Sequence, residues 1–187
     1  MEKTALFIHG YHSDSESTTG GYVGEVLREF GYEVIHPTFD LLDFDASIAQ
    51  MKQIVKEKNV TLVASHSLGG FYGYVLPLDL PKIFVNPCLK PEIEIPKLVF
   101  EGEIFPEEIK SVWVNAREQA KKKQSDKNIL YGIFAKNDEL FSYADYAKTE
   151  LGFGCIQMIE GGHKPPKDEL QMSLRMLLKL QTQIDFK

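Results

Sequence analysis

Three residue types that act together in acyl transfer occur in this sequence, as Ser67, Asp138 and His163. A serine hydroxyl is a weak nucleophile at neutral pH, so a base must take its proton as it attacks. An imidazole, whose ordinary pKa is about 6.5, can accept that proton and later give it to a leaving group. A carboxylate can hold the imidazole in the right tautomer and stabilise its cation. Together, the three could cleave an ester through a covalent acyl intermediate.

The segment around the serine predicts a sharp turn between a strand and a helix. The apolar run 60–64 is short and β-branched, which favours a buried parallel strand over a helix. The small residues of 65–70 follow it, and 71–76 can form a core-facing helix that ends at Pro77. Strand, tight turn and helix are the context of a nucleophile elbow, in which a strained turn raises one serine, here Ser67, above the sheet.

The match to the elbow pattern G-x-S-x-G is near rather than complete. Gly69 and Gly70 supply the small residues that the close strand and helix require, but Ser65 stands where the first glycine is usual. His66 is also a bulkier neighbour to the nucleophile than the small residue expected there. An ordinary turn at the end of a strand is the alternative interpretation, and the choice depends on partners later in the chain.

Strands and helices alternate along most of the sequence. The alternation predicts one α/β domain over residues 1–187, with three α/β/α layers and a mainly parallel six-stranded sheet. Apolar runs predict the strands at 4–9, 33–36, 60–64, 82–86, 129–135 and 155–159. Helical periodicity predicts helices over 22–30, 48–55, 71–76, 109–120 and 143–151, and a closing helix that buries Leu170, Leu174, Leu177 and Leu178. Asp45 or Ser47 could cap the second of these helices.

Residues 88–128 interrupt the alternation. The stretch contains several prolines and an amphipathic segment that includes Trp113. It could be a helix packed on the sheet, or a lid-like insertion that covers the active site and shapes its acyl pocket. We expect a mixture of the two. The triplet Lys121-Lys122-Lys123 is expected to be a solvated helix end.

The expected topology brings the three chemical groups to one sheet edge. Ser67 leaves the third strand, Asp138 the fifth and His163 the sixth, and ligands of open α/β sheets gather where strands end. The chain order Ser, Asp, His is that of the α/β-hydrolase fold. Two backbone N–H groups, those of Leu68 and Tyr11, are predicted to bind the oxyanion.

Other candidates remain for the acid and the base. Glu139 is a rival to Asp138, which could also be a simple turn residue. The remaining histidines are weaker candidates for the base, because three precede the nucleophile and the fourth is adjacent to it; they are His9, His12, His36 and His66. His12 could line the mouth of the pocket.

Composition excludes several classes of protein. The net charge of −6 argues against general binding to nucleic acid or anionic membranes. Apolar runs are too short for membrane insertion, and the N-terminus lacks a signal-peptide pattern. Cys88 and Cys155 form neither a disulfide framework nor a zinc motif, and we expect both to be buried. These features predict a cytoplasmic protein without metal or cofactor, and they leave its oligomeric state undetermined.

Several segments resemble one enzyme family. His9–Ser13, Ser65–Tyr72 and Val85–Pro87 resemble the YqiA-like esterases, which are small bacterial α/β-hydrolases that lack the first antiparallel strands of the larger enzymes. Asn137–Glu139, followed by Tyr143, and Glu160–His163 fit that family's acid and histidine loops. The resemblance covers nearly the whole chain and is weakest over residues 88–128. It implies an esterase of short acyl esters with Ser67, Asp138 and His163 as its triad.

The sequence therefore predicts a serine hydrolase, a carboxylesterase acting on a small-molecule ester of small to medium acyl chain. A thioesterase is a close variant, because the same groups cleave both ester types. A hydrolase-fold protein that has lost turnover and serves as a binding module is the alternative of a different class.

Overall fold

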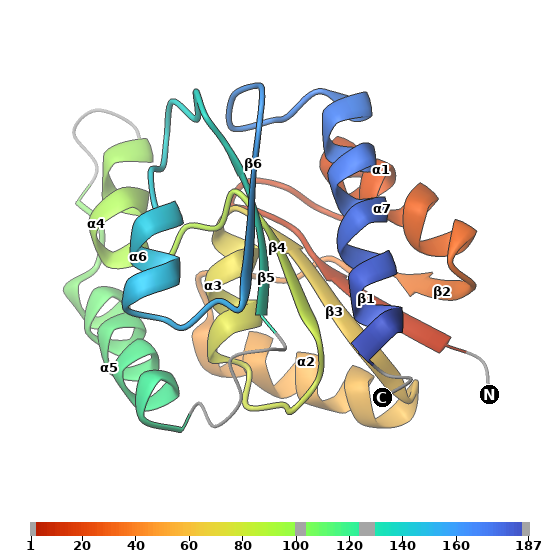
Figure 1. The fold of residues 1–187 in the computed structure, drawn as a ribbon. Helices are drawn as coiled ribbons and strands as arrows, with labels where there is room; N and C mark the ends of the chain where they lie inside the picture. Colours follow the sequence, from red (N-terminus) through yellow and green to blue (C-terminus); the bar gives the residue numbers. More distant parts are fainter. Residues whose placement is uncertain (1–2, 100–103, 124–129, 185–187) are drawn as a thin grey trace.

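The fold is built on a six-stranded, all-parallel sheet in the order β2-β1-β3-β4-β5-β6 (Figure 1). The computed structural model describes residues 3–99, 104–123 and 130–184. The strands are β1 Lys3–Ile8, β2 Tyr32–Ile35, β3 Val60–His66, β4 Lys82–Val85, β5 Leu130–Ala135 and β6 Cys155–Ile159. The chain first runs outward from β1 to β2, then returns to β3 and continues in the other direction. The switch point, where such sheets bind ligands, therefore lies between β1 and β3.

Helices cover both faces of this sheet. The helices are α1 Thr18–Glu29, α2 Phe44–Glu57, α3 Leu68–Val75, α4 Pro91–Glu94, the 3-10 helix η1 Ile95–Leu98, α5 Glu107–Lys123, α6 Ala144–Thr149 and α7 Lys167–Ile184. Helices α1 and α7 lie side by side on one face, and α2, α3, α5 and α6 lie on the other (Figure 1). The predicted three-layer α/β/α architecture is confirmed.

Successive residues of each strand enter different cores, as the period of two requires. In β1, Leu6 and Ile8 join the core beneath α2, α3 and α5, whereas Ala5 and Phe7 join the core beneath α1 and α7. Both faces of a central strand are buried, which explains why its sequence is an unbroken apolar run rather than an alternating one.

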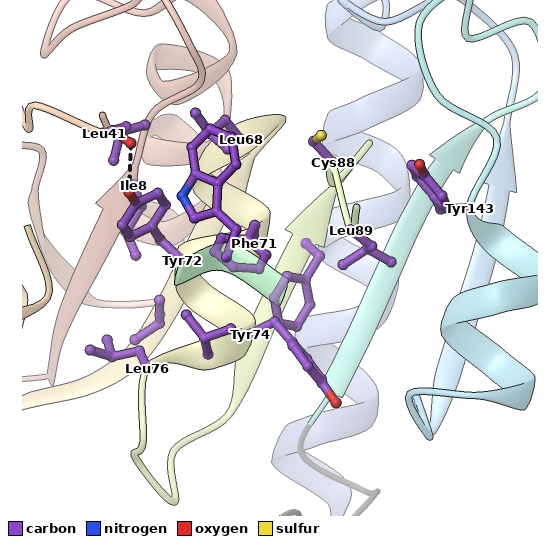
Figure 2. Packing of buried hydrophobic residues seen from close by; sticks show 14 of the residues in the cluster. Ile8, Leu41, Leu68, Phe71, Tyr72, Tyr74, Leu76, Cys88, Leu89 and Tyr143 are labelled. Carbon is purple, nitrogen blue, oxygen red and sulfur yellow. Dashed lines mark hydrogen bonds between the residues drawn. The ribbon is translucent and has the colours of Figure 1, made fainter. Parts of the chain in front are cut away.

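Helix α3 is buried along its whole length and anchors the first core (Figure 2). The Tyr72 hydroxyl donates to the Leu41 carbonyl at 2.5 Å. Trp113 of α5 is fully buried, with its ring centre 6.2 Å from that of Phe71 and 5.4 Å from that of Phe105. Helix α5, which spans much of the stretch 88–128, therefore packs on α3, and the lysine triplet forms its last turn.

Two helices begin earlier than their periodicity predicts, because polar residues cap them. Ser17 Oγ accepts the N–H of Gly20 at 3.2 Å, so α1 begins at Thr18. The predicted caps of α2 are wrong, since Asp43 accepts the N–H of Ala46 at 3.1 Å. Ser47 lies inside α2, where its hydroxyl donates to a backbone carbonyl.

Several smaller expectations can be compared with the structure. The four leucines predicted for the closing helix are buried in α7. Cys155 is only half-buried, because β6 is an edge strand, whereas Cys88 is fully buried as expected. Ile129, the predicted start of β5, and residues 100–103 and 124–128 of the stretch 88–128 lie outside the described residues. Among the helices described, none has the length and apolarity to cross a membrane.

Candidate active site

Ser67 occupies a strained turn between β3 and α3. Its backbone has φ of 57° and ψ of −127°, in the left-handed half of conformational space that non-glycine residues rarely adopt. Backbone hydrogen bonds to β4 and to the residues after it hold the turn: Ser67 N–H donates to the Val85 carbonyl at 3.2 Å, and Cys88 N–H donates to the Ser67 carbonyl at 2.8 Å. The neighbouring strand β4 and the residues after it therefore fix the serine in place.

Close backbone contacts explain the small residues around Ser67. A Cβ atom on Gly69 would lie 2.3 Å from the Ile8 and His9 carbonyl oxygens, and one on Gly70 would lie 2.4 Å from Pro87 Cβ. Neither position could hold a side chain without moving the backbone. Ser65, at the place of the usual first glycine, is fully buried. Its hydroxyl reaches the Ile83 carbonyl of β4 at 3.3 Å, so the site tolerates this departure from the elbow pattern.

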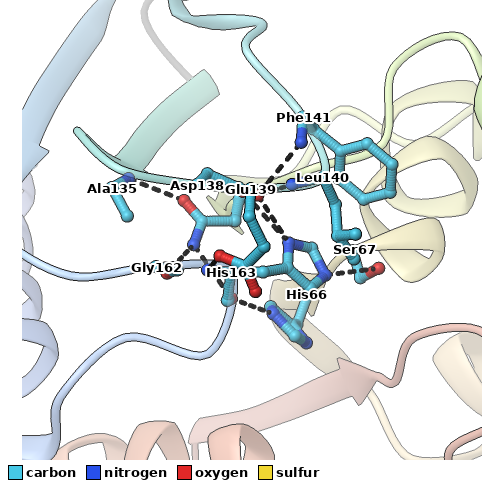
Figure 3. Close-up of polar contacts among 10 residues, drawn as sticks. His66, Ser67, Ala135, Asp138, Glu139, Leu140, Phe141, Gly162 and His163 are labelled. Atoms are coloured by element: carbon cyan, nitrogen blue, oxygen red, sulfur yellow. Dashed lines mark hydrogen bonds and ion pairs between the residues drawn. The ribbon is translucent and has the colours of Figure 1, made fainter.

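The three residues selected from the sequence form a continuous chain of hydrogen bonds (Figure 3). His163 Nε2 lies 3.0 Å from Ser67 Oγ, and His163 Nδ1 lies 3.0 Å from Asp138 Oδ2 and 3.2 Å from Oδ1. The side chains of His163 and Asp138 are only 7% and 3% exposed, so this chain is shielded from solvent. Because a carboxylate only accepts, Nδ1 carries the proton, and Nε2 is left free to accept one from the serine.

The two neighbouring acidic residues have different partners. Asp138 Oδ1 accepts the N–H groups of Leu140 and Phe141 at 2.8 and 3.0 Å, which orients its carboxylate toward the imidazole. Glu139 Oε2 instead accepts the backbone N–H of His163 at 2.9 Å, and this hydrogen bond lowers the pKa of Glu139. Asp138 is thus the acid in contact with the ring, and Glu139 holds the backbone.

Asn86 and His66 hold the same histidine from its other side. Asn86 Nδ2 donates to the carbonyls of Gly162 and His163 at 3.1 and 3.0 Å, while Asn86 Oδ1 accepts the Ala135 N–H at 2.7 Å. His66 Nε2 donates to the His163 carbonyl at 3.0 Å. We call Asn86, His66 and Glu139 the clamp, because their side chains fix the backbone of His163.

The electrostatics of the clamp fit a positioning role. Burial lowers the pKa of His66 to about 4, so its ring is neutral at pH 7 and donates through one nitrogen. Its ring centre lies 4.9 Å from that of His163. The Phe141 ring packs edge-on against the same imidazole, with the two ring centres 4.8 Å apart. The sequence analysis treats His66 as a bulky neighbour and a weak candidate for the base, and it gives Asn86 no role in the site beyond the resemblance of Val85–Pro87. The available signal was a polar residue directly after a buried strand and before Pro87.

The loop after β1 approaches the serine closely. A Cβ atom on Gly10 would lie 2.8 Å from Ser67 Cβ, so only glycine lets the two backbones meet here. His9 is buried; its Nδ1–H donates to the Gly10 carbonyl at 2.8 Å, and its Nε2 accepts the Phe39 N–H at 2.9 Å. His9 is therefore structural, and burial lowers its pKa.

The remaining predicted residues lie at this loop and at the start of α3. Leu68 is the first residue of α3, where backbone N–H groups have no acceptor within the helix. Tyr11 lies one residue beyond Gly10, and the exposed His12 ring contacts its ring at 3.9 Å between centres. His36 takes no part in the hydrogen bonds of Ser67, His163 and Asp138. Its ring packs edge-on against Phe7, with the two ring centres 4.6 Å apart.

Esterases and other hydrolases are among the solved structures that share this architecture. Est1E from Butyrivibrio proteoclasticus matches over 100% of this chain and 90% of its own, with a TM-score of 0.73 and 18% identity. The fluorophosphonate-binding serine hydrolase F of Staphylococcus aureus matches over 94% and 83%, with a TM-score of 0.63 and 16% identity. A thioesterase domain from the curacin biosynthetic pathway matches over 95% and 91%, with a TM-score of 0.59 and 13% identity. The chain has the α/β-hydrolase fold.

The α/β-hydrolase fold is what these likenesses establish, because each identity is below 20%. No protein-family model and no curated protein matches the sequence. The resemblance to YqiA-like esterases therefore stays a prediction within this fold. Over residues 3–99, 104–123 and 130–184, no group of three or more His, Cys, Asp or Glu side chains is arranged to hold a metal ion.

Proposed function

We propose that this protein is a serine hydrolase that cleaves carboxylic esters of small to medium acyl chain through an acyl-enzyme intermediate. The observation that carries the proposal is the buried chain of hydrogen bonds from Ser67 Oγ through His163 to Asp138. The strained turn at Ser67 and the α/β-hydrolase fold support it independently.

The first half of the reaction would acylate the serine. His163 Nε2, 3.0 Å from Ser67 Oγ, takes the hydroxyl proton as the oxygen attacks the ester carbonyl carbon. The carbonyl oxygen becomes an oxyanion, which we assign to the backbone N–H groups of Leu68 and Tyr11. The bond to the alkoxy group then breaks as His163 gives its proton to the leaving alcohol, and Asp138 stabilises the transient imidazolium.

The second half would release the acid. A water molecule gives a proton to His163 Nε2 and attacks the acyl carbon, and the second tetrahedral intermediate uses the same donors. The ester bond to Ser67 breaks, Oγ regains its proton from His163, and the carboxylic acid leaves. Atoms balance with one water consumed for each ester, and the chemistry calls for no cofactor.

An active-site-directed fluorophosphonate probe tests the proposal. It should label the native chain and fail to label Ser67→Ala, whereas Ser111→Ala, an exposed serine on α5, should be labelled like the native chain. With a short p-nitrophenyl ester, Ser67→Ala and His163→Ala should each lose kcat by a factor on the order of 10⁴ to 10⁶. A well-folded native chain that neither reacts with the probe nor hydrolyses the ester would indicate a binding module instead.

Thioester hydrolysis is the second candidate. The thioesterase domain with the same fold is the observation that favours it, and the mechanism needs only a thiolate in place of the alcohol as leaving group. Matched oxygen and sulfur esters of one acyl group separate the two. A kcat/KM for the thioester that exceeds the oxygen ester by much more than the difference in their uncatalysed rates would favour the thioesterase.

We also propose that the stretch 88–128 is a lid-like insertion of a single domain and borders the acyl pocket. Support comes from its first residue, Cys88, whose backbone N–H donates a hydrogen bond to the Ser67 carbonyl. Further along, Glu94 Oε1 accepts the Tyr143 hydroxyl at 2.7 Å, which links α4 to the segment after Asp138. Tyr143→Phe removes this link, so KM should change for longer acyl chains more than for acetyl esters. An unchanged chain-length profile would contradict the role in the pocket.

A further inference from the structure

A cavity of about 420 Å³ lies on the α2, α3 and α5 side of the sheet, away from the candidate active site. Its lining includes Lys82, the first residue of β4. It also includes Leu76, which follows the last residue of α3 and is labelled in Figure 2. Ser67 follows the last residue of β3. Because β3 and β4 run parallel, the serine lies where the strands end and the cavity lies where they begin. This volume is within the range of cavities that hold small molecules.

Lys82 is an unusual residue in such a place, because lysine is almost never fully buried unless it is paired. It is 5% exposed, and its Nζ donates to the Leu76 carbonyl at 2.7 Å. An ammonium group has three N–H donors, and among the described residues this carbonyl is its one hydrogen-bonded acceptor. No ion pair with a described carboxylate compensates for the burial, which lowers the pKa of Lys82 to about 8 despite the opposing effect of Asp79.

The charges around the cavity favour an anion. Lys52 of α2 and Lys123 of α5 also line it, and Asp79 is the one described carboxylate in the lining, against three lysines. Most of the remaining lining is apolar, and it includes Phe44, Ile48, Val75, Leu78, Ala116 and Ala120. Lysine ammonium groups together with a mostly apolar lining are complementary to a molecule with an anionic head and an aliphatic tail.

We propose that this cavity binds an amphiphilic carboxylate, such as a medium-chain fatty acid, with its head group on Lys82 Nζ and its tail between α2 and α5. The carboxylate would accept the two N–H groups that Leu76 does not use and would supply the missing counter-charge. Lys82 also caps the end of α3, but that role uses one donor and does not require a cavity beside it. The proposal does not depend on the assigned chemistry of Ser67.

Calorimetric titration with sodium octanoate and with octan-1-ol tests the proposal on the full chain. Octanoate should bind at least tenfold more tightly than octan-1-ol, which has the same tail without the charge. Lys82→Met should weaken octanoate at least tenfold and leave octan-1-ol unchanged, whereas Ala120→Phe, which fills the cavity, should weaken both. Lys121→Met is the matched control, because this lysine of α5 pairs with Glu150 and is not part of the lining, and it should change neither affinity.

Nuclear magnetic resonance of the native chain locates the ligand without any variant. Octanoate should shift the amide signals of Leu76, Leu78 and Lys82 and leave those of Ser67 and His163 in place. Ser67→Ala should bind octanoate as the native chain does, so loss of hydrolysis and loss of this site are separate results. Shifts confined to Ser67 and His163, equal binding of acid and alcohol, or affinities unaffected by both Lys82→Met and Ala120→Phe would overturn the proposal.

Discussion

Replacement of Asn86 by alanine should loosen the loop that carries His163. The substitution leaves the side chains of the three reacting residues unaltered. Asn86 is 2% exposed, and its side chain makes three hydrogen bonds, at 3.1, 3.0 and 2.7 Å, to Gly162, His163 and Ala135. These bonds join the end of β4 to the residues that precede Asp138 and to the loop that carries His163. Their loss should affect both the free energy of unfolding and the rate of hydrolysis.

The expected loss of stability follows from the contacts. Each hydrogen bond contributes about 1 kcal/mol, and the substitution removes all three. Asn86 also has a left-handed backbone with φ of 41°, which costs alanine about 1 kcal/mol more than asparagine. The free energy of unfolding of Asn86→Ala should therefore fall by about 4 kcal/mol. A displacement of the imidazole should lower kcat by about 10- to 100-fold with KM little changed, because no contact to the substrate is removed.

Asn59→Ala is the matched control. Asn59 also has a left-handed backbone, with φ of 49°, but it is exposed in the turn before β3 and its side chain has no hydrogen bond among the described residues. Urea unfolding should show a loss of about 1 kcal/mol for this variant, and ester hydrolysis well below the unfolding transition should show a native kcat. If Asn86→Ala loses no more stability than Asn59→Ala, or retains the native kcat, the clamp does not position His163.

Two further predictions concern the elbow and the pH dependence of stability. Gly69→Ala should lower the free energy of unfolding by about 3 kcal/mol or more, since its Cβ would lie 2.3 Å from two backbone oxygens. Gly21→Ala on the open side of α1 should raise it by about 1 kcal/mol, and equal effects would refute the packing argument. His66 binds its proton more weakly in the folded chain, with a pKa of about 4, than in the unfolded chain, with a pKa of about 6.5. The contribution of neutral His66 to the free energy of unfolding is complete above pH 6.5 and is lost as the pH falls toward 4. The free energy of unfolding should therefore be about 2 kcal/mol lower at pH 5 than at pH 8 from this residue. Urea titrations of His66→Gln should show a smaller fall in the free energy of unfolding between pH 8 and pH 5 than the native chain shows. An equal fall in the two proteins would contradict the assignment.

Local patterns were sufficient for most of the elements. The apolar run of β3 and the leucine spacing of α7 each reflect burial, which repeats with the geometry of the element itself. The start of α2 was misplaced because Asp43, Asp45 and Ser47 can each cap a helix. Tertiary packing decides between them: the Phe44 ring lies 5.6 Å from that of Tyr72, which places it inside the first turn of α2.

The candidate site was predictable in part for a related reason. Ser67, Asp138 and His163 follow strands, and a parallel sheet brings all its strand ends to one edge, so their meeting follows from the order of elements. Asp138 was the acid predicted, but the order of elements does not separate it from its rival Glu139. The choice between them depends on which carboxylate turns toward the ring, and the two differ by one position in a loop.

The amino-acid sequence alone determined the class of fold, the strained serine turn and the residue types available for acyl transfer, because short-range spacing encodes these features. Tertiary structure alone decided that Asn86, His66 and Glu139 hold the backbone of His163, and that Lys82 is buried beside a cavity. His66 and His163 are 97 positions apart, and no local periodicity relates them. Contacts of this kind depend on where loops from different strands meet, and only the packed sheet fixes that arrangement.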